Sequence, residues 1–202
     1  LVARRAEQKR EFLASRDIWT RPVQFANAPD GNLYFLDIYR SLIEGAAFLP
    51  PEFLPHLKPV GGNDRGRIYR IATADFQPTR PPNLREATTA QLVGMLAHPN
   101  GWHRDTAARL LYQRQDRSAI RPLREMVAKA GLSQGRMTAM YALRGLSALT
   151  ADAILSGLQD AEPMVRVHAL KLAEPVIVEA PEIALRVTEM TNDADPRVRY
   201  QL

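Results

Sequence analysis

Five polar side chains lie at the ends of two predicted strands, where they could meet and do chemistry. Arg21 precedes the first strand, and the second strand leads into Asp37, Tyr39, Arg40 and Glu44. A carboxylate in such a place can bind calcium or act as a general base, and a guanidinium can hold a carboxylate through two parallel hydrogen bonds. The alternative is structural: Arg21 donates to loop carbonyls, and Asp37 pairs with an arginine to hold the segment that follows. Both interpretations remain open at this point.

Metal and covalent chemistry find little support elsewhere in the sequence. The chain has no cysteine, which excludes disulfides, thiolate metal sites, cysteine nucleophiles and covalent haem attachment within it. The histidines are His56, His98, His103 and His168. No two of them have the spacing of a helical zinc site, so we expect no metal centre. The sequence also offers no glycine-rich phosphate loop, no Ser-His-Asp set and no pair of glycosidase carboxylates.

The charge balance allows a nucleic-acid partner without favouring one. The chain carries 27 Lys and Arg against 22 Asp and Glu, a net charge of +5. Such an excess can attract nucleic acid or anionic lipid. Several arginines extend over two predicted helices: Arg104, Arg109, Arg114, Arg117, Arg121 and Arg124. Because acidic residues are interleaved with them and no aromatic series accompanies them, a solvated, salt-bridged surface is the preferred interpretation, and nucleic-acid binding is the alternative.

The elements that would position the first polar group are strands. In residues 1–75, "PVQFA" and "NLYFLDIY" predict a hairpin over 22–38, closed by a Pro-Asp-Gly turn whose glycine supplies the positive φ. "LVARR" and "REFLAS" are shorter strand-like runs before it, and "RGRIYRIA" predicts a further strand after an insertion over 41–63. Both faces of the hairpin are apolar, which is typical of strands inside a stack of sheets. Since the chain supplies few neighbouring strands, we expect Phe25, Tyr34 and Phe35 to be unusually exposed unless the 41–63 insertion or the first helix pair covers them.

The second part of the sequence has a helical period. A proline-rich linker is predicted at 76–86, and helical repeats at 87–202, in pairs at about 88–115, 118–148, 151–179 and an incomplete 181–202. "DAEPMVR" at 160–166 recurs as "DADPRVR" at 193–199, an offset of 33, each with an acidic cap, an early proline, a valine and an arginine. This pattern resembles HEAT repeats and predicts an α-solenoid. The small residues Ala107, Ala142 and Ala169 are expected to let neighbouring helices approach closely.

The order of these motifs resembles a family of large exported proteins from planctomycetes and their relatives, known as membrane-bound dehydrogenase-domain or haem-binding proteins. The resemblance is carried by "EFLASRDIWTRPVQFANAPDGNLYFLDIYRSLIEG", then "DRGRIYRI", then "HPNGWHRDTAARLLYQRQD". It implies a six-bladed β-propeller like that of PQQ sugar dehydrogenases, then HEAT repeats, then often a cytochrome c module. Residues 1–75 would be the C-terminal strands of the propeller, joined to a HEAT-like solenoid.

The resemblance also implies where a cofactor would bind. Arg21 would hold the quinone carboxylates, and Asp37, Tyr39 and Arg40 would belong to the same cofactor site, so PQQ and calcium are possible in the larger propeller. No cofactor is expected within this chain alone. Haem would belong only to a module that is absent here, because the Cys-x-x-Cys-His motif is missing. The larger protein would be exported, periplasmic or membrane-associated, although neither a signal peptide nor a membrane span is visible in this chain.

Three functions follow as hypotheses. The first is a fragment of a quinoprotein that oxidises sugars or alcohols, with no turnover expected from this fragment alone and with the HEAT part as a scaffold. The second is a non-catalytic HEAT module that docks a protein, or further domains of its own protein. The third is the basic, nucleic-acid-binding HEAT protein.

Overall fold

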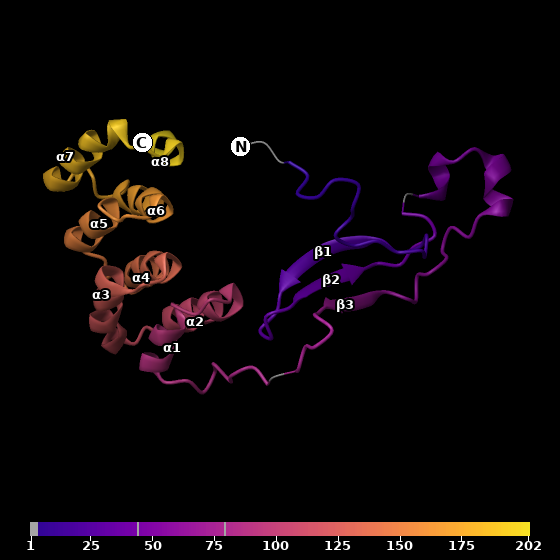
Figure 1. Ribbon diagram of the computed structural model, residues 1–202, viewed down its shortest axis with the longest axis horizontal. Coiled ribbons are helices and arrows are strands. Elements are labelled where there is room, and N and C mark those ends of the chain that lie inside the picture. The colour runs from indigo at the N-terminus through magenta and orange to yellow at the C-terminus, as the bar shows by residue number, and fades with distance from the viewer. Residues whose placement is uncertain (1–3, 44, 79) are drawn as a thin grey trace. The chain divides into compact units, whose positions relative to one another are not determined.

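A computed structural model describes residues 4–43, 45–78 and 80–202, and its architecture is mixed, β followed by α (Figure 1). The chain divides into two compact parts, residues 1–78 and 79–202, which we call the sheet unit and the helix unit and describe separately. The division falls inside the proline-rich segment 76–86. Within the described residues, no helix is long and apolar enough to cross a membrane.

The sheet unit is built on three antiparallel strands in the order β1-β2-β3. Their bounds are Pro22–Asn27 for β1, Leu33–Asp37 for β2 and Arg67–Ile71 for β3. The β1–β2 turn follows from its residues: Gly31 has φ +84°, and Asp30 accepts hydrogen bonds from the Asn32 N–H (3.1 Å) and the Tyr34 hydroxyl (3.0 Å). The Pro-Asp-Gly turn predicted from the sequence is therefore present.

The expected exposure of the hairpin aromatics is right for Phe25 and wrong for Phe35. Phe25 on the edge strand is 50% exposed, whereas Phe35 is only 5% exposed. Because β2 is the central strand, neighbouring rings cover Phe35 on both sides, Phe25 at 6.0 Å and Tyr69 at 5.0 Å between ring centroids. Tyr34 lies between these extremes, since it is partly buried and its hydroxyl is held by the turn.

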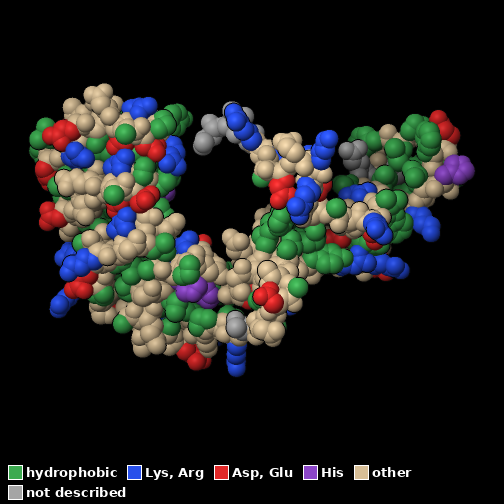
Figure 2. Space-filling model, viewed as in Figure 1, with side chains coloured by type: hydrophobic (Ala, Val, Ile, Leu, Met, Phe, Trp, Pro, Cys, Tyr) green, Lys and Arg blue, Asp and Glu red, His purple; other side chains and the backbone are tan. Residues whose placement is uncertain are grey.

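The opposite face of the sheet is also apolar and open. Leu36 of β2 and Ile68 of β3 are cross-strand partners, and both are exposed. Hydrophobic side chains accordingly gather over the strands in Figure 2. The sheet unit therefore exposes apolar groups on both faces.

The strands predicted before the hairpin are not formed. Residues 4–16 contain no strand, and Phe12 among them is 78% exposed; the first three residues of "LVARR" lie outside the described residues. A short charged segment gains little by becoming a strand unless another strand satisfies its backbone groups. None of the described strands pairs with this one.

The insertion between β2 and β3 closes on itself at its base. It contains two short 3-10 helices, η1 (Ala46–Phe48) and η2 (Pro51–His56), and the Ser41 N–H donates to the Gly61 carbonyl at 3.1 Å. Tyr39 adopts left-handed backbone with φ 48°, and Gly62 has φ +85°. A Cβ on Gly62 would overlap the carbonyl oxygen of Tyr39, so only glycine fits there.

The helix unit is a succession of short helices. The described α-helices are α1 (Thr89–Met95), α2 (Gly101–Arg114), α3 (Ile120–Lys129), α4 (Ser133–Gly145), α5 (Ala151–Leu158), α6 (Pro163–Ala173), α7 (Pro181–Glu189) and α8 (Pro196–Gln201), with 3-10 turns η3 (Arg117–Ala119) and η4 (Met190–Asn192). Each odd-numbered helix contacts the next odd-numbered one, and each even-numbered helix the next even-numbered one. The helices thus form two layers (Figure 1), and we call α2, α4, α6 and α8 the second-helix layer.

Local sequence sets several of the helix starts. The Thr88 side chain and Gln91 form a reciprocal capping box at α1, and the Asn100 side chain caps α2 by accepting from the Trp102 N–H at 3.0 Å. Proline occupies the first turn of α6, α7 and α8, where its missing N–H costs nothing. The helices enclose one continuous hydrophobic core. Its fully buried side chains include Leu92, Leu123, Leu143, Leu158, Leu172 and Ile183.

Small buried residues mark the close approach between helices. The fully buried alanines that follow the repeated arginine by three residues are Ala107, Ala139 and Ala169. The sequence pattern predicts Ala142 for this position in α4, which is wrong by one helical turn, because Arg136 sets the register. Gly157 of α5 serves the same packing: a Cβ there would lie 2.9 Å from the Cβ of Ala169.

Candidate functional site

The polar residues predicted in the sheet unit do come together, but around a backbone brace. The Asp37 carboxylate is 1% exposed, and its Oδ1 accepts the backbone N–H groups of Arg21 and Tyr39, both at 2.8 Å. Asp37 ends β2 while Arg21 precedes β1, so the carboxylate fixes the two chain segments that enter and leave the hairpin. Its Oδ2 makes no hydrogen bond within the described residues, and the nearest cation is Arg67 at 4.0 Å.

Arg21 and Arg40 contact the backbone of the segment before β1. The Arg21 guanidinium donates to the carbonyl oxygens of Ile18 and Thr20, the latter at 3.0 Å. This is the structural alternative considered for Arg21. Arg40 donates through its backbone N–H to the Trp19 carbonyl at 3.0 Å, and Glu44 lies outside the described residues.

Tyr39 is held by both of its ends. Its hydroxyl donates to Asp17 Oδ2 at 2.8 Å, and the guanidinium carbon of Arg67 lies 3.7 Å from the centre of its ring. The pKa of Asp17 is lowered by the hydrogen bond from the Trp19 N–H and by the one from Tyr39. The phenol is therefore part of the loop structure.

The contacts of these residues are structural ones and include no arrangement built for PQQ or calcium within the described residues. A guanidinium holds a quinone carboxylate through two parallel donors, whereas Nη1 of Arg21 is directed at the loop carbonyls of Ile18 and Thr20. A calcium site needs several convergent oxygens, and no group of three or more His, Asp or Glu side chains suited to a metal occurs within 4–43, 45–78 and 80–202. The arrangement in the sheet unit therefore serves to hold the loops.

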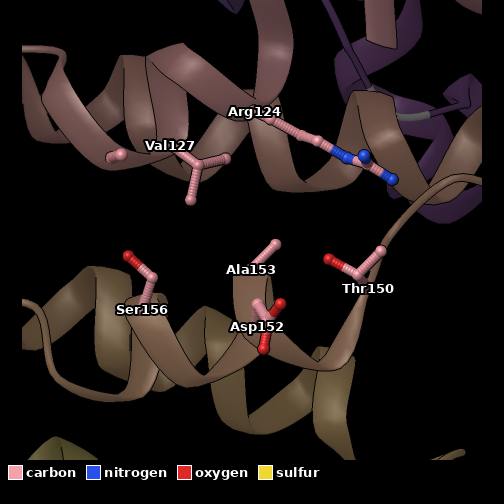
Figure 3. Close-up of a pocket in the computed structure, with 7 residues that line it drawn as sticks. Arg124, Val127, Thr150, Asp152, Ala153 and Ser156 are labelled. Carbon is pink, nitrogen blue, oxygen red and sulfur yellow. The ribbon is translucent and has the colours of Figure 1, made fainter. Parts of the chain in front are cut away.

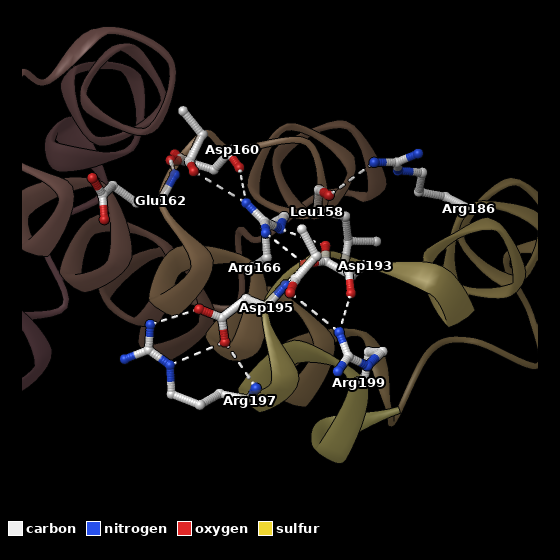
Figure 4. A network of polar contacts seen from close by, with 11 residues as sticks. Leu158, Asp160, Glu162, Arg166, Arg186, Asp193, Asp195, Arg197 and Arg199 are labelled. Atoms are coloured by element: carbon white, nitrogen blue, oxygen red, sulfur yellow. Dashed lines mark hydrogen bonds and ion pairs between the residues drawn. The ribbon is translucent and has the colours of Figure 1, made fainter.

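The helix unit contains a second polar system, which runs from one helix pair to the next. Arg136 of α4 makes two hydrogen bonds to Asp160, at 2.6 and 2.7 Å, and Arg166 of α6 makes two to Asp193, at 2.8 and 2.7 Å. The remaining guanidinium nitrogen of Arg166 donates to the carbonyls of Asp160 (2.8 Å) and Ala161 (3.1 Å). Figure 4 shows the later part of this chain of contacts, which we call the Arg–Asp ladder.

We call each arginine with the aspartate that it binds a rung of the ladder, so Arg136–Asp160 and Arg166–Asp193 are two complete rungs. The same donor geometry occurs beyond these two rungs. The arginines of the ladder each donate to the carbonyls six and five residues earlier in the sequence: Arg104, Arg136, Arg166 and Arg199. Residue 130 stands where the acid of the first rung belongs, but it is alanine. Arg104 accordingly lacks the carboxylate that Arg136 and Arg166 have, and the first rung is incomplete.

Electrostatics favour the ionised ladder. Burial raises the pKa of Asp160, but the hydrogen bonds from Arg136 and the Glu162 N–H outweigh it, and the pKa lies below its ordinary value of 3.8. The hydrogen bonds from Arg166 lower the pKa of Asp193 despite burial. Beside the ladder, Arg197 lowers the pKa of Asp195 to about 2. The acids therefore stay charged at neutral pH.

The repeated D-x-x-P-x-V-R pattern identifies Asp160, Arg166, Asp193 and Arg199, but neither Arg136 nor the partner of any of these residues. The pattern predicts an acidic cap followed by an arginine on one helix. In the structure each complete rung joins different helix pairs. The available signal was the spacing: an arginine six residues after the acid recurs at 160/166 and 193/199.

The surface of the second-helix layer has a cleft between α4 and α6. It has a volume of about 240 Å³ and is lined by Ser133, Gln134, Met137, Met164, Val165 and His168. At its edge the Tyr141 hydroxyl and His168 Nδ1 are 2.8 Å apart. Burial raises the pKa of Tyr141 and lowers that of His168. The imidazole is therefore neutral near pH 7.

A second shallow cleft lies in the other layer, between α3 and α5. Its volume is about 270 Å³, and Figure 3 shows Arg124 on one wall and Asp152 and Thr150 on the other. Arg124 and Asp152 are exposed. No ion pair joins them in the described structure. This cleft is an open, mixed-charge surface.

Comparisons with known proteins extend to the sheet unit only. A family described as a domain of unknown function (DUF7133) matches residues 2–75, a little over a third of the chain. No curated protein and no solved structure shows significant similarity to the chain. The matched region is thus similar to an uncharacterised domain and contains the hairpin, the Asp37 brace and β3.

Proposed function

We propose that this chain is a non-catalytic interaction scaffold in which a HEAT-type α-solenoid, the helix unit, follows the last strands of a propeller-like sheet. The observation that carries this proposal is the Arg–Asp ladder. The same guanidinium contacts recur from pair to pair, so the helices stack in one direction and build an extended surface. Solenoids of this kind use such surfaces to bind proteins.

The sheet unit supports a structural part in this scaffold. Its apolar side chains are exposed on both faces, and β1 and β3 are both edge strands. Such a sheet is suited to pack between further sheets, as a blade does in a propeller. Asp37 Oδ1 and Arg21 Nη1 bond to backbone groups of the loops, which supports a structural role for both residues.

The nucleic-acid alternative is weaker. Of the arginines that suggested it, Arg114 donates to the carbonyls of Ala87 and Arg85, and Arg121 pairs with Glu125. Arg104 belongs to the ladder. The set is also spread over α2 and α3, which belong to different layers.

Photo-crosslinking tests the scaffold proposal. A benzoylphenylalanine would replace Tyr112, exposed on the second-helix layer, or, as the matched control, Arg121, exposed on α3. After irradiation in an extract of the source cells, we expect one defined protein adduct from position 112 and none from position 121. Equal adducts from both positions, or none from either, would contradict the proposal.

The dehydrogenase activity implied by the resemblance is a proposal about a larger protein, and no residue of this chain is assigned to it. PQQ, calcium and a sugar would be added to the 202-residue chain with an electron-accepting dye. We expect no sugar-dependent dye reduction. Turnover would overturn the non-catalytic assignment of the sheet unit.

A further inference from the structure

We propose that the cleft between α4 and α6 binds a short peptide segment that inserts one large apolar side chain and places acidic residues beside it. The inference rests on the scaffold function proposed above and names the place and the kind of partner. The occupant is a segment of another protein, with an apolar anchor flanked by Asp or Glu.

The walls of the cleft suit an apolar anchor. Met137 of α4 and Met164 of α6 line it together with Val165, and Met164 is 40% exposed. Methionine side chains are flexible and polarizable, so they adapt to differently shaped apolar groups and are common at binding surfaces. Ser133 and Gln134 add polar groups at the rim, which can orient a bound backbone.

One end of the cleft is fixed. Tyr141 and Met137 are one turn apart on α4, as His168 and Met164 are on α6. The hydrogen bond between the Tyr141 hydroxyl and His168 Nδ1, with the rings edge to face at 5.5 Å, ties the two helices together at this end. The two methionines therefore project from helices whose spacing is held, and the site is preorganised.

Unpaired cations flank this fixed end. Arg144 lies close enough to Tyr141 to oppose the rise in its pKa that burial causes, and Lys171 acts with burial to lower the pKa of His168. Both cations are exposed, and neither forms an ion pair within the part of the chain that the structure describes. Carboxylates on the ligand would complement them, which sets the sign of the partner's charge.

Peptide display on the full 202-residue chain tests the proposal. A random library of peptides would be selected on the chain, and enriched peptides would be labelled and titrated by fluorescence anisotropy. We expect the enriched sequences to share a Leu, Met or Phe with Asp or Glu within one helical turn. Their affinity should fall as salt is raised, because exposed charge pairs are screened.

Variants locate the binding site. Arg144→Glu with Lys171→Glu should weaken binding about tenfold, the equivalent of about 1.4 kcal/mol, and Met164→Glu should weaken it further. The matched control, Arg124→Glu with Lys129→Glu on α3, makes the same charge change in the other layer and should leave the affinity within about twofold. Circular dichroism would confirm that each variant retains its helices.

The outcomes separate this inference from the scaffold proposal. If enriched peptides bind the α4–α6 variants as tightly as the wild type, the cleft is not their binding site. The same holds if the control variant loses as much affinity as the α4–α6 variants. Either result leaves the scaffold proposal intact. Failure to enrich any peptide with the stated chemistry would also overturn the proposal that the cleft binds such a peptide. The scaffold proposal is tested separately, by the crosslinking experiment.

Discussion

The two units of this chain are stabilised in different ways. In the helix unit, one apolar core extends from Leu84 to Val198. In the described part of the sheet unit, the buried hydrophobic side chains are Phe35 and Tyr39, and the fold there depends on a buried carboxylate and on loop hydrogen bonds. The helix unit thus carries its own core, while the sheet unit leaves apolar faces open to other contacts.

The largest effect is expected from a cavity in the helix core. Leu143→Ala should cost about 3 kcal/mol of unfolding free energy in the helix unit, since Leu143 is fully buried. Phe25→Ala in the sheet unit should cost about 1 kcal/mol or less, because half of that side chain is already exposed. Hydrogen exchange read peptide by peptide would report each unit separately. Equal losses would contradict the contrast between the two cores.

Removing the buried carboxylate should affect the sheet unit alone. Asp37→Ala leaves the N–H groups of Arg21 and Tyr39 without their acceptor, at a cost of about 2 kcal/mol. Asp37→Asn retains one acceptor oxygen and should cost less. Limited proteolysis around residues 17–41 would rise in the order wild type, Asn, Ala. Equal cleavage rates in the wild type and both variants would show that the Asp37 brace does not hold the loop.

The ladder should show direct coupling. A double-mutant cycle of Arg166→Ala and Asp193→Ala should give an interaction of about 1.5 kcal/mol, because the pair is bidentate and mostly shielded from water. Each single variant should cost about 2 kcal/mol. Denaturation followed by circular dichroism gives the values. Additive effects would mean that the rung contributes little.

This rung should also make stability depend on acid. The pKa of Asp193 lies below 3.8 in the folded chain, so the folded state binds the proton less tightly than the unfolded state. Its contribution is present above pH 3.8 and is lost as the pH falls through the lowered value. Asp193→Asn should flatten that part of the stability profile.

Completing the first rung should stabilise the stack. Ala130→Asp would place a carboxylate six residues before Arg136 and opposite Arg104, as Asp160 and Asp193 are placed in the later rungs. Ala130 already has extended backbone, with φ −63° and ψ 128°. We expect a gain of about 1 kcal/mol, lost again when Arg104 is changed to Ala. No gain, or a gain that survives Arg104→Ala, would refute the rung geometry.

The smallest effect concerns His168. Burial holds its pKa below 6.5, so the folded state resists protonation and stability should decline as the pH falls from 6.5 towards the lowered value. The facing groups are Tyr141, which bonds to the ring, and Lys171, which adds to the shift. His168→Gln should remove this slope between about pH 7 and pH 5 in the same denaturation assay. A slope unchanged in the variant would assign it to other histidines.

Local signals predicted much of the fold. The Pro-Asp-Gly turn and β3 were visible because turn chemistry and alternation are short-range. Helix starts were visible where proline or an acidic cap marks them, as at Pro163 and Pro196. Local sequence did not predict the burial of Phe35, because that burial depends on which strand lies at the centre of the sheet. The false strands before the hairpin fail for the same reason: a strand needs a partner that local sequence does not specify.

The candidate sites show the same division. The structure brings Arg21, Asp37 and Tyr39 together. Asp37 Oδ1 and Arg21 Nη1 bond to backbone groups there, which residue types alone do not reveal. The α4–α6 cleft was missed altogether. Met137, Met164 and His168 look like ordinary helix residues until the stacking of the pairs brings them to one place.

The ladder gives the helix pairs an order in which they can be joined. In the pair at 151–179, Asp160 binds the arginine of the preceding pair, and Arg166 binds the aspartate of the following pair. A second copy of this pair, inserted directly after it, would therefore have a partner for both residues. The pair at 118–148 offers Arg136 but presents Ala130 to its predecessor, so its copy would leave a gap. Lengthening by duplication is therefore easiest in the later part of the stack, and the Arg–Asp contacts determine which helix pair can follow which.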